Sequence, residues 1–138
     1  MISHIYNRTM QKDFDTWNKI KKKINTIETE LPFYTGQIWW CSVRLNVGHE
    51  IDGKHNTFER PFYIFKKCNA DMFIGIPCTS NYKDRAFMYK LRTPRVKFVL
   101  NFSQIKTMSS KRLLRRIVNI STFFQEDIKK NFFNYINR

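Results

Sequence analysis

From residue 36 onward, short runs of aromatic and β-branched residues alternate with turn-forming residues, and this pattern restricts the possible folds. Aromatic and β-branched side chains favour strands, whereas glycine, proline, asparagine and aspartate mark the turns between them. The pattern predicts strands over residues 37–45, 61–68, 72–79, 87–91 and 96–103, with 104–107 extending the last strand. Several short strands at this spacing favour a small β-barrel over a βαβ fold.

Three other segments have the spacing of amphipathic helices. Apolar residues at intervals of three and four predict a helix over 10–31, a short helix over 110–117 and a last helix over 122–136. Thr122 and Gln125 have the spacing of a capping box at the start of the last helix. The apolar stripe of that helix comprises Phe124, Ile128, Phe132, Tyr135 and Ile136. The predicted fold class is mainly β with helices (α+β), with a helical extension at 1–34 and a barrel domain at 35–138.

The charge of the chain is strongly positive and unevenly distributed. Among 138 residues, 25 are lysine or arginine and 11 are aspartate or glutamate, which gives a formal net charge of +14. The segment from Lys83 to Arg116 holds eleven basic residues and one acid, Asp84. Such density is typical of a surface that follows phosphates, although a solvated basic face would have the same composition. Aromatic residues lie between these charges and would suit single-stranded nucleic acid, but most of them are expected in the core.

The cysteines and the apolar runs argue against several classes of protein. Cys41, Cys68 and Cys78 are odd in number and lack C-x-x-C spacing, which argues against a disulfide framework and against a structural zinc site. The first ten residues lack the apolar region of a signal peptide, and no apolar run has the length of a membrane span. We therefore expect a soluble protein in a reducing, cytoplasmic compartment.

Five short motifs follow one another in an order that indicates a family. They are GQIWW at 36–40, VGHEIDGK at 47–54, ERPFYI at 59–64, IPCTS at 76–80, and SQIKT at 103–107 followed by RL at 112–113. This ordered set resembles the PemK/MazF family, the toxins of type II toxin–antitoxin systems, from about residue 36 to the C-terminus. Residues 1–34 have no counterpart in the minimal family pattern.

The resemblance implies an SH3-like barrel with C-terminal helices, and a homodimer. It also implies an endoribonuclease that cuts single-stranded RNA (mRNA) without a metal or other cofactor, and a cognate antitoxin whose acidic tail lies across the RNA site. The RNA 2′-hydroxyl would attack the phosphodiester and leave a 2′,3′-cyclic phosphate and a 5′-hydroxyl. The enzyme then needs only to position the RNA, move protons and stabilise charge. Consistently, most acidic residues are scattered singly and form no cluster of the kind that Mg²⁺ needs.

Three residues are candidates for catalysis on this resemblance. Arg60 matches the arginine before the proline of the second strand, and its planar guanidinium suits phosphate oxygens. Thr79 matches a hydroxyl residue at the end of the third strand, where it would bond a phosphate oxygen or the 2′-hydroxyl. His49 matches a histidine of one branch of the family and would serve as base or acid. Each residue also has a non-catalytic interpretation. Arg60 could be a surface arginine paired with Glu59, Thr79 could bond only to backbone groups, and His49 could be an ordinary solvated histidine.

Further residues are candidates for contact with RNA, namely Ser80, Lys54, Lys83, Arg85, Gln104 and Lys106. Lys106 stands where the family more often has arginine, and a lysine cannot make the bidentate contact that a guanidinium makes with phosphate. One branch of the family has Arg-x-Asp just before the glutamine of the fifth motif, whereas Asn101 and Ser103 stand there in this chain. The identity of the general base is therefore open. Trp39 and Trp40 fall on opposite faces of the first strand and are expected in the core and in a dimer contact.

Two other functions remain possible on the sequence. The same barrel serves toxins that act on a protein target such as DNA gyrase, and a chain without the Arg-x-Asp pair could be a non-catalytic RNA-binding module. The helix predicted over 10–31 must bury its six apolar residues against the barrel or in a dimer. Those residues are Phe14, Trp17, Ile20, Ile24, Ile27 and Leu31.

Overall fold

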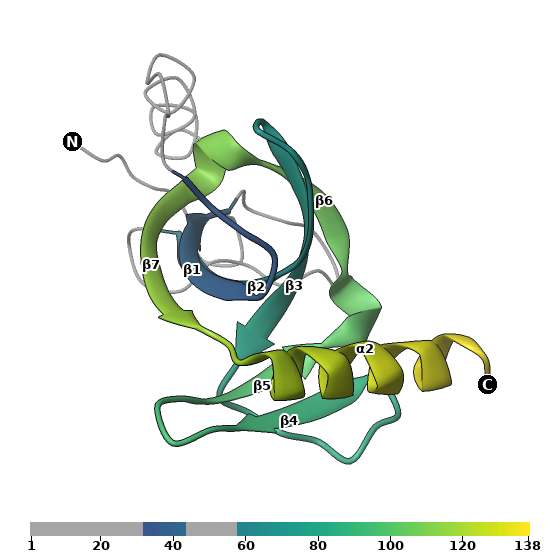
Figure 1. Ribbon diagram of the computed structural model, residues 1–138. Coiled ribbons are helices and arrows are strands. Elements are labelled where there is room, and N and C mark those ends of the chain that lie inside the picture. Colours follow the sequence, from purple (N-terminus) through teal and green to yellow (C-terminus); the bar gives the residue numbers. More distant parts are fainter. Residues whose placement is uncertain (1–31, 44–57) are drawn as a thin grey trace, which may run out of the picture.

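The computed structural model describes residues 32–43 and 58–138 (Figure 1). The helix predicted over 10–31 lies outside the described residues, and so does most of the long connection between the first two strands. His49 and Lys54 belong to that connection, so their predicted roles stay predictions.

The described residues form seven strands, two 3₁₀ turns and one α-helix. In chain order they are β1 (Gln37–Ser42), β2 (Glu59–Asn69), β3 (Met72–Thr79), β4 (Met88–Arg92), β5 (Lys97–Asn101), η1 (Phe102–Gln104), β6 (Lys106–Ser109), η2 (Ser110–Arg112), β7 (Leu113–Asn119) and α2 (Thr122–Ile136). The mainly β class with a C-terminal helix is confirmed. No helix among the described residues is long and apolar enough to cross a membrane.

The strands pair antiparallel in the order β4-β5-β3-β2-β1-β7, and β6 also pairs with β3. In Figure 1, β1, β2, β6 and β7 curve around one another, and α2 runs between them and the β4–β5 hairpin. Within the described part of the chain no pairing joins β6 to β7, so the curved sheet is open. The closed barrel predicted from the sequence is therefore not confirmed.

Apolar side chains pack on both faces of the sheet because successive side chains of a strand alternate between faces. The first group, which we call the inner cluster, comprises Phe33, Trp39, Cys41, Val43, Phe62, Ile64, Phe73, Met108 and Leu113. The second, the helix-side cluster, comprises Ile38, Tyr63, Ile76, Cys78, Tyr89, Leu91, Leu100, Phe102, Val118, Ile120 and Ile128. The same division defines two faces of the sheet, an inner face and a helix-side face.

The prediction of a short helix over 110–117 is wrong. Ser110–Arg112 forms only a 3₁₀ turn, in which the Ser109 side chain accepts a hydrogen bond from the Lys111 backbone N–H at 3.2 Å. The chain then extends as β7, which pairs with β1 from Cys41↔Leu113 to Gln37↔Asn119. The spacing of the leucines suited a helix, but the unpaired edge of β1 offers backbone hydrogen bonds to an extended segment.

The expected extension of the fifth strand through 104–107 is also wrong. That strand ends at Asn101, whose side-chain oxygen accepts from the Ser103 backbone N–H at 3.0 Å and the Ser103 hydroxyl at 2.6 Å. These two bonds turn the chain through η1, because an asparagine side chain can replace a strand partner locally. The segment after the turn becomes β6, which pairs with β3 instead.

The last helix occupies the predicted residues, but its start and its stripe differ from the prediction. Ser121 is the N-cap and makes no side-chain capping bond, while Gln125 Nε2 donates to the Ile120 carbonyl at 2.7 Å. The capping box is therefore not formed. Ile128 is fully buried, whereas Ile136 is 56% exposed because the helix extends beyond the sheet at its C-terminal end (Figure 1).

Candidate functional site

Arg60 is buried at the start of β2 and bonds to the next strand. The residue is only 7% exposed, and its Nη1 donates to the Cys78 backbone carbonyl at 3.2 Å. This bond uses one of the five N–H donors of the guanidinium. The predicted alternative, a surface arginine paired with Glu59, is wrong, because Glu59 pairs with Arg115 at 3.0 Å.

The backbone explains why a side chain is needed at this point. β2 and β3 pair as far as Phe62↔Pro77, and β3 then pairs with β5 from Cys78↔Leu100. Pro61 and Pro77 both lack an N–H and cannot contribute donors where the two strands separate. The Arg60 guanidinium supplies a donor to the Cys78 carbonyl, which ties the end of β3 to β2.

Thr79 ends β3 directly after Cys78, whose carbonyl accepts the hydrogen bond from Arg60. The pairing of β2 with β3 ends at Phe62↔Pro77, two residues from Arg60 on one strand and two residues from Thr79 on the other. Side-chain alternation places both residues on the inner face, the face that carries Phe62. Thr79 Oγ1 accepts from the Asn81 backbone N–H at 3.3 Å, which is the backbone role considered as an alternative. A hydroxyl that accepts one bond can still donate its own proton.

Lys106 reaches the same face from a third strand. It is exposed on β6 opposite Gly75, two residues before the inner-cluster residue Met108. Its Nζ lies 5.8 Å from the centre of the Phe62 ring. Arg60, Thr79 and Lys106 therefore share the inner face, although Lys106 lies opposite Gly75, four residues before Thr79. Gln104, in η1, is partly buried two residues earlier.

Ser80, Lys83 and Arg85 follow Thr79 in the connection to β4 and are all exposed. In the same connection the Tyr82 hydroxyl donates to Asp84 at 3.4 Å, and the Tyr82 ring lies 4.2 Å from Lys90 Nζ on β4. The connection thus carries exposed cations next to the Thr79 end of the inner face. The sequence analysis did not propose Lys90 as a contact with RNA, because only the strand register shows which face of the sheet it occupies.

The basic segment from Lys83 to Arg116 is distributed over several elements rather than over one. Lys90 and Arg92 lie on β4, Lys97 lies on β5, and Arg115 lies on β7. Arg115 bonds Glu59 and stacks 5.3 Å from the half-buried Trp40 ring.

The two tryptophans differ in burial. Trp39 is buried in the inner cluster, whereas Trp40 is only half-buried on the other side of the strand. The expected separation of the two rings onto opposite faces is therefore observed. A dimer contact for Trp40 stays a prediction.

The position of the family's Arg-x-Asp pair has a structural use in this chain. Asn101 is buried and holds η1 through its bonds to Ser103, so these two residues shape the turn that leads to Lys106. Neither side chain has an ionisable group near neutral pH.

The buried thiols are not nucleophiles at neutral pH. Burial raises the pKa of Cys41 and of Cys78 far above the ordinary value, because the thiolate loses its solvation. For Cys41 the neighbouring Cys78 raises the pKa further. Cys68, by contrast, is exposed at the end of β2. Thiol chemistry is thus not part of the Arg60 site.

We expect one fast-reacting thiol per folded chain in a titration with a chromogenic disulfide reagent, and two more only after unfolding. The fast thiol is Cys68, since a reagent reaches an exposed thiol and the other two are buried. The Cys68→Ser variant should lose the fast phase and keep the two slow ones. Three fast thiols would show that the burial of Cys41 and Cys78 is not maintained in solution.

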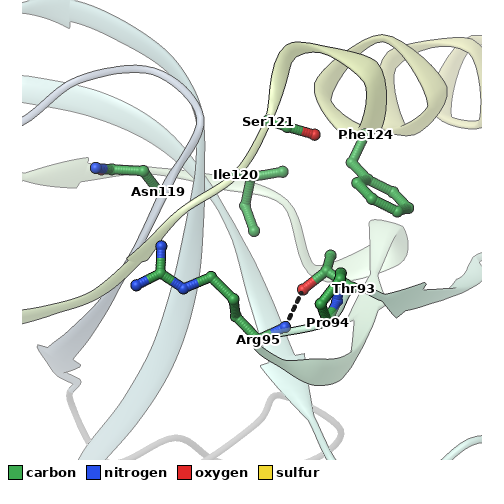
Figure 2. A pocket seen from close by; sticks show the side chains of 7 residues that line it. All are labelled: Thr93, Pro94, Arg95, Asn119, Ile120, Ser121 and Phe124. Atoms are coloured by element: carbon green, nitrogen blue, oxygen red, sulfur yellow. Dashed lines mark hydrogen bonds between the residues drawn. The ribbon is translucent and has the colours of Figure 1, made fainter.

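Two pockets occur in the described structure away from these residues. Figure 2 shows the first, of about 360 Å³, between the β4–β5 turn and the start of α2; in it Thr93 Oγ1 accepts from the Arg95 backbone N–H at 3.1 Å. The second, of about 520 Å³, lies between α2 and the strands β2 and β3. Neither is lined by Arg60, Thr79 or Lys106. Of those three residues, Lys106 is exposed, Thr79 is partly buried and Arg60 is buried.

The described residues contain no group of three or more His, Cys, Asp or Glu side chains that could hold a metal ion. On the inner face they do contain a threonine hydroxyl, a guanidinium and an ammonium group, those of Thr79, Arg60 and Lys106. Such groups bind and polarise a phosphate through hydrogen bonds and charge.

Comparison with solved structures defines the class of the fold. MazF (Form-I) from Deinococcus radiodurans aligns with a TM-score of 0.61 at 14% identity, over 79% of this chain and 100% of that chain. An endoribonuclease from Mycobacterial species, in complex with its cognate antitoxin, gives 0.58 at 11% identity, over 77% and 96%. MazE–MazF (Form-II) from Deinococcus radiodurans gives 0.58 at 12% identity, over 78% and 97%. The chain therefore has a MazF-like fold.

The sequence itself places the chain in a family. The family model described as "PemK-like, MazF-like toxin of type II toxin-antitoxin system" matches residues 34–132. The chain belongs to this family, as the motif order predicted. A search of curated proteins gives no significant match.

Proposed function

We propose that this protein is a toxin that cleaves single-stranded RNA at specific sequences without a metal ion. The 2′-hydroxyl of the RNA attacks the adjacent phosphorus, and the products are a 2′,3′-cyclic phosphate and a 5′-hydroxyl. The observation that carries the proposal is the hydrogen bond from the Arg60 guanidinium to the carbonyl of Cys78, the residue that precedes Thr79. Membership of the toxin family and the endoribonuclease among the structural neighbours support it.

The two side chains divide the chemistry between them. The negative charge on the phosphate grows in the transition state, and the Arg60 guanidinium stabilises it through charge-assisted hydrogen bonds. The Thr79 hydroxyl donates to a non-bridging oxygen or orients the 2′-hydroxyl. A metal is not needed, because the nucleophile is part of the substrate. His49 is proposed as an auxiliary proton-transfer group, and Lys106 as a phosphate contact that the Phe62 ring supports.

The proposal extends to two protein partners. One of the structural neighbours is an endoribonuclease in complex with its cognate antitoxin, and another is MazE–MazF. We propose that this chain also has an acidic antitoxin, whose charge is complementary to the +14 of the toxin, and that it works as a homodimer.

The test is an incubation of the purified protein with a long RNA in excess EDTA. We expect discrete cuts at one recurring short sequence, with 5′-hydroxyl ends that polynucleotide kinase labels directly and 3′ ends that resist extension until the cyclic phosphate is removed. Cleavage that requires added Mg²⁺, or products with 5′-phosphates, would contradict the proposed chemistry.

The same incubation separates the other two functions. Intact RNA that is nevertheless shifted in a gel would favour the non-catalytic RNA-binding module, in which the Arg60 bond to Cys78 only holds the strands together. Intact RNA without a shift would direct the search to a protein target such as DNA gyrase.

A further inference from the structure

The inner face does not end at Thr79. Thr79 pairs with Val99 on β5, and Val99 pairs in turn with Lys90 on β4. Directly opposed residues of neighbouring strands point to the same face of a sheet. The side chains of Thr79, Val99 and Lys90 therefore form one row across three strands, on the face that is opposite the helix-side cluster. Val99 is itself buried, so the exposed lysine is the group that a ligand meets next.

Two more cations continue this face along the hairpin. Arg92 and Lys97 are directly opposed, and each lies two residues from a member of the row. Both are exposed, and Arg92 Nη1 donates to the Phe98 carbonyl at 3.2 Å. Like charges that face each other across a sheet repel. The sequence has no acidic residue between Asp84 and Glu126, so nothing within this stretch of chain neutralises them.

An aromatic ring accompanies the charges at the end nearer the site. Tyr82 is 39% exposed, and Lys90 Nζ lies 4.2 Å from the centre of its ring. The contact holds ring and ammonium group together. An exposed ring beside a line of cations is the combination that binds single strands, since bases stack on rings while cations contact phosphates.

We propose that Lys90, Arg92 and Lys97 together with Tyr82, here called the hairpin basic face, bind the single-stranded RNA that flanks the cleaved phosphodiester. This inference rests on the proposed function for the position of the scissile phosphate at Arg60 and Thr79. The strand of RNA then leaves Thr79, passes the Tyr82–Lys90 pair and runs along the hairpin. An acidic peptide would satisfy the cations but has no base for the ring, so RNA fits the surface better.

The test compares two double variants of equal charge. Lys90→Gln/Lys97→Gln removes two cations from the hairpin basic face, and Lys129→Gln/Lys130→Gln removes two from α2, where both lysines are exposed. Binding of a long single-stranded RNA is measured at several salt concentrations, and thermal unfolding confirms that each variant is folded. A polyglutamate chain serves as the peptide probe, and cleavage of a long RNA gives KM.

For the hairpin variant we expect the slope of log K against log salt to become shallower by about 1.4, since each lost phosphate contact on a single strand contributes about 0.7. The same relation gives roughly 25-fold weaker binding at about 0.1 M salt. KM for the long RNA should rise accordingly, and the α2 variant should behave as the wild type in both measurements.

The outcomes separate this inference from the proposed function. An unchanged salt slope in a hairpin variant that still cleaves RNA would overturn the inference and leave the nuclease intact. A reduced slope with no cleavage by any form, wild type included, would support the RNA-binding face and refute the nuclease. Loss of polyglutamate binding with unchanged RNA binding would overturn the inference in favour of a peptide surface.

Discussion

Replacing Arg60 by alanine is expected to lower the rate of RNA cleavage by about 10²- to 10³-fold, the usual effect of losing one preorganised donor to developing charge. The guanidinium is buried and fixed by the Cys78 carbonyl, so no reorganisation is needed when charge develops on the phosphate. The measurement is the single-turnover rate at saturating RNA, where weaker binding does not contribute.

Arg60→Ala also removes a strand-to-strand bond, so a second variant is needed to separate chemistry from folding. Arg60→Lys keeps a cation but loses the planar fork that can hold the Cys78 carbonyl and a phosphate together. We expect most of the rate loss to persist in Arg60→Lys while its thermal unfolding stays closer to that of the wild type. Arg138→Ala, which removes an exposed arginine beyond α2, is the charge-matched control. A rate for Arg60→Lys within threefold of the control would contradict the catalytic role.

Ile128→Ala is expected to reduce the free energy of unfolding by about 2–5 kcal/mol, which is typical of truncating a fully buried isoleucine to alanine. Ile128 has no exposed surface and is the fully buried residue of α2 in the helix-side cluster, against which Phe124, Phe132 and Tyr135 also pack. Its loss leaves a cavity between α2 and the sheet. Urea denaturation followed by tryptophan fluorescence measures the change.

Ile136→Ala makes the same chemical change eight residues further along the same helix. Ile136 is 56% exposed, so we expect the free energy of unfolding to change by about 0.5 kcal/mol or less. Equal destabilisation by the two substitutions would mean that the C-terminal end of α2 is covered in solution, for instance by a partner molecule. That result would contradict the packing of α2 described for the single chain.

The elements that the sequence predicted well are those with an unambiguous local pattern. β3 and α2 begin and end at the predicted residues, because the Asn69–Asp71 turn limits β3 and the 3.6-residue period of apolar positions defines α2. The wrong prediction of secondary structure over 110–117 falls where one stretch of sequence is compatible with both a helix and a strand. Leu113, Leu114 and Ile117 suit a helix by spacing and a strand by composition, and pairing with β1 decides between them.

The sequence motifs select Arg60 and Thr79 as candidates, since a strand-opening arginine before proline and a strand-ending hydroxyl can be recognised from the order of residues. Their catalytic roles stay predictions, and their contacts could not be read from the sequence. The partner of Arg60 was missed, because the Cys78 carbonyl is a backbone group and carries no residue-type signal. The alternative pairing with Glu59 failed because neighbours in a strand point to opposite faces, and Arg115 on β7 lies on the side of Glu59.

The sequence by itself determined the family, the succession of short strands and a final helix, and the excess of positive charge. These properties depend on residue types and on their local spacing, which folding does not change. Only the tertiary structure decided which strands are neighbours, and hence that Arg60, Thr79 and Lys90 share one face of the sheet. The physical reason is that strand register depends on hydrogen bonds between distant segments, and a shift of one residue would move each side chain to the other face.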